Sequence, residues 1–271
     1  MKIFAIRDET AQVQTDLAYL LYYELEKRFY IELPENADPW DTPLLLSSFL
    51  KKGETTVNAY WSKLWVQQRI LPTDRQNIAQ VLKDNDLQSY DEYELLMLSM
   101  GRCAQDDYYL VPLEEAMLPE SIRARFLKRI EDVIPLDGYS LLVFFRDGKV
   151  RKCDLKQYLS QHSGFQILLK KPELFPHVRM QTGGYGITWD VQLSISDTVL
   201  YKMGKSVPLT AGDFRSFIEH NVVTAAEAAH LLNCSRQNID DLVKRGKLQP
   251  IKATGKTTLF FKSEITQRSW Q

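Results

Sequence analysis

The C-terminal part of the chain is organised around VTAAEAAHLLNCSRQNIDDLVKRGKLQPI, residues 223–251. Thr224 followed three residues later by Glu227 is the pattern of a capping box, in which each side chain bonds the backbone N–H of the other residue. It predicts a helix that begins after Thr224 and ends near Leu232. Ser235 predicts the start of a second helix, because a serine oxygen accepts a bond from the unpaired N–H groups of a first turn.

The second helix is expected to run from Ser235 to Lys244 and to end at Gly246, since glycine readily adopts the left-handed conformation that terminates helices. Two short apolar segments follow, at 248–251 and 257–261. The turn residues 254–256 between them predict a two-stranded wing. A last short helix is expected directly after the second strand.

This order of elements resembles the winged helix-turn-helix of excisionase-like and MerR-like regulators, from Asn221 to Trp270. The shared pattern is T-x-x-E-A-A-x-L-L, then S-R-Q, R-G-K-L, a wing and a helix. The resemblance implies that the second helix enters the major groove of double-stranded DNA and that the wing contacts the DNA backbone. The expected DNA-binding residues are Ser235, Arg236, Gln237, Lys244, Arg245, Lys252, Lys256 and Lys262.

Two acidic residues interrupt the exposed face of the second helix. Arg236 and Gln237 are good readers of guanine and adenine edges, but Asp240 and Asp241 stand where the resembled family usually has tyrosine or basic residues. Carboxylates in a DNA groove repel phosphates. Either the helix binds DNA with reduced affinity, or it now packs against a protein.

The charge of the chain is unevenly distributed. The 271 residues have a net charge of −1. Residues 1–135 carry 15 Lys and Arg against 23 Asp and Glu, residues 136–220 carry 11 against 8, and residues 221–271 carry 8 against 4. An acidic front and a basic back predict modules with different partners. The 44% hydrophobic and 25% charged composition is that of a globular protein, not of a disordered or fibrous one.

The middle segment is predicted to be mostly β. Strands are expected at 139–145 and 150–154, joined at Asp147-Gly148, a strong hairpin signal. A second hairpin is expected around 182–185. The segment 133–201 resembles a family of small bacterial domains of unknown function, which occur alone or fused to a helix-turn-helix and often beside putative toxin genes. The resemblance implies no activity.

The N-terminal segment is predicted to be mostly helical after a brief strand at 2–7, because apolar residues recur at helical spacing from Leu17 to Phe29. Further helices are expected at 44–50, 57–71, 75–85 and 91–100. Residues 65–113 resemble the leader segment of some HipA-like toxin kinases. The matching residues are Arg69, Pro72, Arg75, Asn77, Leu95, Gly101 and Asp107. Phosphoryl transfer does not carry over, because the sequence has no H-R-D or D-F-G motif.

Aromatic residues crowd this N-terminal segment: Tyr60, Trp61, Trp65, Tyr90, Tyr93, Tyr108 and Tyr109. Two interpretations stay open, a helical core and a partner-binding groove. The basic residues of a linker helix at 119–132, namely Arg123, Arg125, Lys128 and Arg129, are interpreted as a solvated face.

No pattern in the sequence predicts catalysis, a cofactor or a metal. Thr254-Gly255-Lys256-Thr257 superficially resembles a phosphate loop, but Pro250 stands where a glycine N–H is needed. The four histidines are isolated, and the three cysteines form no C-x-x-C pair. The segment 183–186 is interpreted as a hairpin with flexible glycines, not as an anion loop. The start of the chain lacks a signal-peptide pattern, and no apolar run suits a membrane helix.

The sequence therefore predicts a bacterial, cytoplasmic α+β protein with a helical interaction domain at 1–118, a linker helix at 119–132, a small antiparallel domain at 133–205 and a winged helix-turn-helix at 221–271. The expected function is that of a non-enzymatic DNA-binding transcriptional regulator, antitoxin-like or excisionase-like. It would act as a homodimer with a protein partner bound through residues 1–205. The alternative is a protein-interaction adaptor whose helix-turn-helix only packs against a partner.

Overall fold

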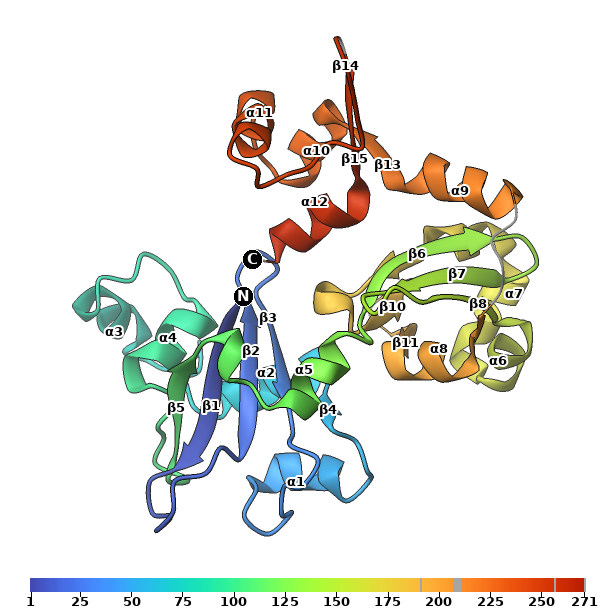
Figure 1. Ribbon diagram of the computed structural model, residues 1–271. Coiled ribbons are helices and arrows are strands. Elements are labelled where there is room, and N and C mark those ends of the chain that lie inside the picture. The colour runs from blue at the N-terminus through green and yellow to red at the C-terminus, as the bar shows by residue number, and fades with distance from the viewer. Residues whose placement is uncertain (191, 207–210, 256, 271) are drawn as a thin grey trace. The chain divides into compact units, whose positions relative to one another are not determined.

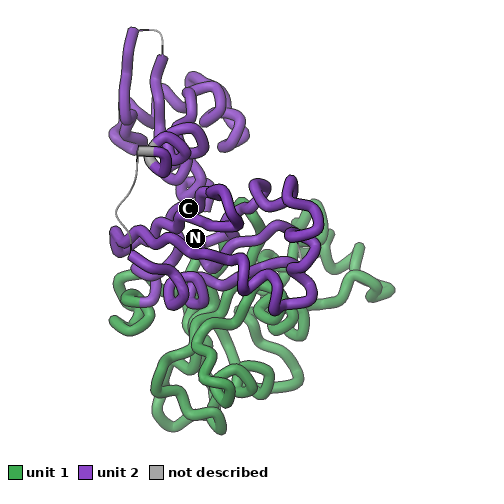
Figure 2. Tube along the Cα trace, turned by 90° about the vertical axis from the view of Figure 1, so that its right-hand side faces the viewer, with its two compact units in different colours: residues 1–124 green, residues 125–271 purple. Residues whose placement is uncertain are grey.

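The structure is a computed structural model that describes residues 1–190, 192–206, 211–255 and 257–270 (Figure 1). It confirms the α+β fold class. The chain forms two compact units, residues 1–124 and residues 125–271 (Figure 2). Unit 1 carries 12 Lys and Arg against 21 Asp and Glu, and unit 2 carries 22 against 14, so the charge asymmetry follows the division into units. None of the described helices is long and apolar enough to cross a bilayer.

Unit 1 is built on an antiparallel five-stranded sheet of order β4-β3-β2-β1-β5. The strands are β1 (Lys2–Asp8), β2 (Ala18–Tyr23), β3 (Arg28–Glu32), β4 (Thr56–Val57) and β5 (Tyr108–Leu113). The helices are α1 (Leu44–Leu50), α2 (Ala59–Gln67), α3 (Ile78–Asp84) and α4 (Glu92–Ser99), with a 3₁₀ turn at Glu115–Met117. The four helices predicted after residue 40 are confirmed, with ends that differ by a few residues.

The predicted helix from Leu17 to Phe29 was wrong, because this segment forms the β2–β3 hairpin. All six side chains of β2 are buried, so both faces of this central strand are covered. A strand covered on both faces has a continuous apolar run instead of alternation, and such a run imitates a buried helix. Leu25, which completed the helical stripe, lies in the turn and is 65% exposed.

Unit 2 begins with a sheet of order β12-β8-β7-β6 and a smaller sheet of order β11-β10-β9. The strands are β6 (Ile130–Leu136), β7 (Ser140–Phe145), β8 (Val150–Asp154), β9 (Arg179–Met180), β10 (Gly186–Thr188), β11 (Ser194–Ser196) and β12 (Lys205–Ser206). The helices are α6 (Lys156–Gln161), α7 (Gln166–Lys170) and α8 (Asp197–Met203), with 3₁₀ turns at Ser163–Phe165, Pro172–His177 and Thr182–Gly184. Both predicted hairpins are confirmed by antiparallel pairing, β7 with β8 and β9 with β10.

The predicted linker helix is shorter than expected, because α5 (Glu120–Phe126) ends before strand β6 begins at Ile130. Arg129, between them, is only 3% exposed, so its interpretation as part of a solvated face was wrong. Its Nη1 donates to Asp197 Oδ2 at 2.6 Å, and its guanidinium lies 3.8 Å from the centre of the Tyr185 ring. A buried arginine is tolerated when an opposite charge and hydrogen bonds compensate for lost hydration.

The rest of unit 2 is a helical segment with a three-stranded sheet of order β13-β15-β14. Its helices are α9 (Ala211–Asn221), α10 (Ala225–Leu231), α11 (Arg236–Lys244) and α12 (Lys262–Ser269). Its strands are β13 (Val222–Thr224), β14 (Lys252–Thr254) and β15 (Thr257–Phe261). A small core joins α10, α11 and α12 to β13 and β15, and it consists of Val223, Ala228, Ala229, Ile239, Leu248, Phe260 and Ile265.

Candidate nucleic-acid interface

Helix α10 begins with the predicted capping box. The Thr224 hydroxyl accepts from the Glu227 N–H at 3.3 Å, and the Glu227 carboxylate accepts from the Thr224 N–H at 2.7 Å. The bonds from the Thr224 N–H and hydroxyl lower the pKa of Glu227. The cap fixes where α10 starts, and through the short turn that follows, it fixes the start of α11.

Helix α11 is anchored on one side and open on the other. Ser235 caps it by accepting from the Asn238 N–H at 3.2 Å, and Asn233 makes the preceding turn in the left-handed region, with a φ of 50°. Ile239 is fully buried in the core around it. Gly246 follows the helix with a φ of 66°. The arrangement gives α11 a fixed orientation and leaves its outer face to solvent.

The outer face of α11 carries the side chains that the sequence singled out. Arg236, Gln237, Asp240, Asp241 and Lys244 are all exposed. The Lys244 ammonium lies 3.8 Å from the Asp241 carboxylate, with side-chain exposures of 76% and 54%. An ion pair this exposed contributes about 0–1 kcal/mol, so Lys244 remains free to exchange Asp241 for another anion. The structure thus brings Arg236, Gln237 and Lys244 onto one face of α11, together with the acidic pair.

The predicted wing is present as β14 and β15, paired with Lys252 opposite Leu259 and Thr254 opposite Thr257. Its first strand was expected at 248–251 and lies instead at Lys252–Thr254. Lys252 is exposed on β14, and Arg245 is exposed where α11 ends. The predicted contact Lys256, in the turn of the wing, lies outside the described residues.

Lys262, the first residue of α12, has an unexpected neighbour. Burial raises the pKa of Asp132 on β6 to about 7, while the Lys262 ammonium acts in the opposite direction and lowers it. Asp132 Oδ1 accepts from the Val133 N–H at 2.8 Å. Lys262 is exposed, yet its positive charge favours the ionised form of Asp132, a carboxyl group of the preceding sheet. Sequence reasoning missed Asp132, because only folding brings β6 near α12.

Residues 222–267 match the family model described as a helix-turn-helix domain. This segment is a helix-turn-helix domain. The helix-turn-helix domain contains every element described above from β13 to most of α12, with α11 in the place of the second helix. Residues 130–206 match the family described as a protein of unknown function, DUF2442. Neither family description names an enzymatic activity. No curated protein and no solved structure matches the chain.

The glycine-rich loop at 183–186, within the segment that matches DUF2442, packs closely against neighbouring backbone. Gly184 has a φ of 78° and is buried, and a Cβ on it would lie 2.2 Å from the Ile130 carbonyl oxygen. Gly184 therefore permits close contact with β6, and Gly186, where a Cβ would lie 2.5 Å from the Ile195 carbonyl oxygen, permits close contact with β11. These contacts correct the interpretation that the glycines provide hairpin flexibility. In the described ranges, no three His, Cys, Asp or Glu side chains are grouped as metal ligands would be.

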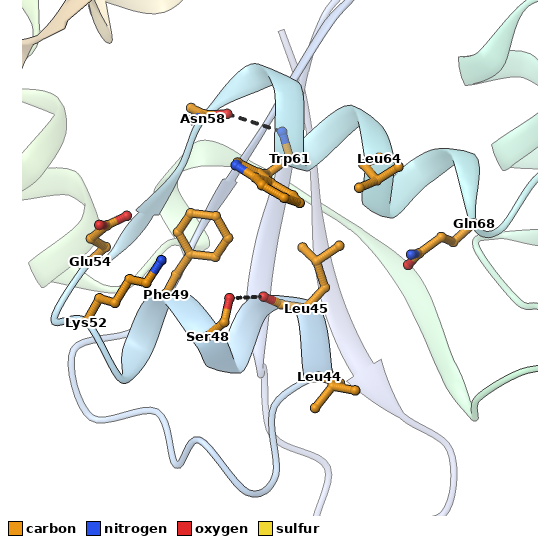
Figure 3. A pocket seen from close by; sticks show the side chains of 10 residues that line it. All are labelled: Leu44, Leu45, Ser48, Phe49, Lys52, Glu54, Asn58, Trp61, Leu64 and Gln68. Atoms are coloured by element: carbon orange, nitrogen blue, oxygen red, sulfur yellow. Dashed lines mark hydrogen bonds between the residues drawn. The ribbon is translucent and has the colours of Figure 1, made fainter.

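A pocket of about 700 Å³ lies in unit 1 between α1 and α2 (Figure 3). Leu45, Phe49, Trp61 and Leu64 give it apolar walls. The aromatic residues of unit 1 divide between the two interpretations of the sequence. Trp65 is 1% exposed and belongs to the core, whereas Trp61 at the pocket is 39% exposed and Tyr60 beside it is 70% exposed.

Proposed function

We propose that this protein is a DNA-binding transcriptional regulator without enzymatic activity. The observation that carries the proposal is the exposed face of α11 within a helix-turn-helix domain, where Arg236 and Gln237 occupy the first helical turn. The first turn of a recognition helix lies closest to the base edges.

In the proposed complex, Arg236 binds guanine O6 and N7, and Gln237 binds adenine N6 and N7. Lys244, Arg245 and Lys252 bind phosphates, as do Lys256 and Lys262. Ser235 retains its hydroxyl hydrogen for a phosphate oxygen, since its cap uses only the lone pairs. Helix-turn-helix proteins usually read two half-sites, so the regulator acts as a cytoplasmic homodimer.

The proposal extends to an antitoxin-like or excisionase-like role. The fusion of a helix-turn-helix domain to a DUF2442 segment supports it, because the small-domain family that this segment resembles often lies beside putative toxin genes. In this role, residues 1–205 bind the protein partner and α11 binds the operator.

The test is a gel shift of the full chain with the DNA upstream of its own gene. Arg236→Ala is expected to weaken binding by about 1–3 kcal/mol, because one bidentate base contact is lost. The matched control is Arg179→Ala, which removes an exposed arginine from β9. Equal affinities of the two variants for the upstream fragment would reject groove insertion by α11.

The adaptor alternative keeps one specific observation in its favour, the pocket between α1 and α2. Unit 1 has a net charge of −9, and Asp38, Asp41 and Glu54 are exposed in or beside α1. A complementary occupant is a protein segment with apolar side chains flanked by basic ones. On this alternative Trp61→Ala abolishes partner binding and Arg236→Ala leaves DNA affinity unchanged, whereas the proposed regulator loses DNA affinity with Arg236→Ala.

A further inference from the structure

Outside the helix-turn-helix domain, three cations surround one tyrosine ring. Lys128 Nζ, Lys149 Nζ and Arg151 Cζ lie 5.9, 5.5 and 4.2 Å from the centre of the Tyr201 ring. Tyr201 lies on α8, Arg151 on β8, Lys149 just before β8 and Lys128 just before β6. A cation within about 6 Å of an aromatic face is attracted by it, but three cations at one ring also repel one another. An anion bound beside them would relieve this repulsion.

The ring is held in place by its hydroxyl group. Tyr201 donates to Asp147 Oδ2 at 2.7 Å, and Lys149 Nζ donates to the Tyr201 oxygen at 2.8 Å and lies 3.1 Å from Asp147. Although burial opposes the shift, the bonds from Tyr201 and Lys149 lower the pKa of Asp147. Phe145 packs against the ring edge at 4.8 Å between centroids. The platform is thus preorganised.

Positive charge at this platform exceeds negative charge. Arg146, the residue before Asp147 in the β7–β8 turn, donates to the Gly183 carbonyl, while Arg151 donates to the Gly204 carbonyl at 2.8 Å. Both acceptors are neutral, and no described carboxylate pairs with Lys128, Arg146 or Arg151. Around the Tyr201 ring, the three cations Lys128, Lys149 and Arg151 face the carboxylate of Asp147, which leaves an excess of two positive charges.

The charges of the sheet are also separated along its length. Residue pairing sets Phe144 opposite Val150 near the cluster, and Ser140 opposite Asp154 at the other end. Asp137 and Asp154 therefore lie at the end of the sheet remote from the cluster. Lys128 and Lys149 are exposed, so their ammonium groups are accessible to a large anionic partner.

We propose that Lys128, Lys149 and Arg151, arranged around the Tyr201 ring and called here the basic platform, bind phosphate groups of a DNA backbone. Lysine and arginine side chains are common phosphate ligands that carry no sequence information. The choice of duplex DNA as the partner rests on the proposed function, because a helix-turn-helix domain in the same chain raises the local concentration of duplex. The platform itself is independent of α11.

The test uses the full chain and a duplex of arbitrary sequence, about two helical turns long, in an anisotropy titration at about 50–200 mM salt. Lys128→Gln with Lys149→Gln should make the log–log salt slope about 1.8 less steep, because two phosphate contacts disappear. The matched control is Lys170→Gln with Lys171→Gln, two exposed lysines of the same domain with the same charge change. The control slope should stay close to that of the unmodified protein.

The single variant Lys128→Gln is a second test, in case the double variant does not fold. It is expected to fold normally, because the Lys128 side chain is exposed and makes no described hydrogen bond. It should reduce the slope by about 0.9. Identical slopes for the platform and control variants would overturn the proposal. So would a platform variant that leaves DNA binding intact and changes the oligomeric state, which would indicate an acidic protein partner.

Two further arms separate the alternatives. Inorganic phosphate at constant ionic strength should leave the slope difference in place, and its loss would indicate a small-phosphate site and overturn backbone binding. Arg236→Ala, titrated against the DNA upstream of the gene instead of the arbitrary duplex, tests the helix-turn-helix domain separately. If that variant binds normally while the platform variants lose slope, the proposed function fails and the platform stands, and the reverse outcome rejects the platform alone.

Discussion

At the scale of single residues, Gly184 and Gly148 share a left-handed backbone conformation, but Gly184 is buried and Gly148 is exposed. Their φ angles are 78° and 79°, but a Cβ on Gly184 would meet the Ile130 backbone, whereas Gly148 has no neighbour within 4 Å. Gly148→Ala should lose about 1–2 kcal/mol of unfolding free energy, the cost of a left-handed alanine. Gly184→Ala should lose a further 1–3 kcal/mol or so from overpacking. Urea denaturation of both variants measures the difference, and equal losses would refute the close contact with β6.

Single residues also mark the limit of sequence reasoning. Arg129 belongs to a run of basic residues that has the composition of a solvated helix face. Its partners Asp197 and Tyr185 are more than fifty positions away along the chain, and nothing local indicates them. The same holds for Asp132 and Lys262. Local sequence patterns cannot identify a buried charge whose compensation comes from a distant segment.

At the scale of elements, helices and hairpins could be predicted where the sequence signal lies within a few neighbouring residues. The Thr224–Glu227 capping box, the Ser235 cap and the Asp147-Gly148 turn each contain their own physical cause, so α10, α11 and the β7–β8 hairpin were predicted. The sheet of unit 1 was not, because pairing between β1 and β5 joins segments a hundred residues apart. The exposed face of α11 was predictable once Ile239 identified the buried one.

The acidic pair on α11 distinguishes the two leading functions. Asp240→Asn with Asp241→Asn keeps side-chain size and removes two negative charges, and it also frees Lys244 from Asp241. If α11 lies in a groove, non-specific DNA affinity should rise about 5- to 30-fold at low salt, since each charge near the surface contributes about 0.5–1 kcal/mol. Anisotropy titration with duplex DNA measures this gain.

The control for this pair is Asp84→Asn with Asp86→Asn, two exposed carboxylates at the end of α3. It makes the same change of net charge and should leave DNA affinity nearly unchanged. If α11 instead packs against a basic protein partner, the α11 variant loses that partner and its DNA affinity does not change. An equal gain in both double variants would show that net charge alone is responsible.

At the scale of the whole molecule, the basic residues are concentrated in unit 2, which has a net charge of +8 against −9 for unit 1. The five lysine and arginine contacts proposed for the helix-turn-helix domain predict a salt slope of roughly −4.5 per protomer, and the two exposed lysines of the basic platform would steepen it to roughly −6.3. Titration of the unmodified chain over a range of salt concentrations measures the sum. A DNA affinity that does not depend on salt concentration would contradict DNA binding by either surface.

The buried pair of Arg129 and Asp197 has a practical consequence for dissecting the chain. The DUF2442 match spans residues 130–206, so a fragment cut at those limits would retain Asp197 and Tyr185 but lose the guanidinium that neutralises one and stacks on the other. Removing one partner of a buried pair costs about 3–5 kcal/mol, a large share of the stability of a small domain. A recombinant fragment that begins at Glu120 keeps both α5 and the arginine.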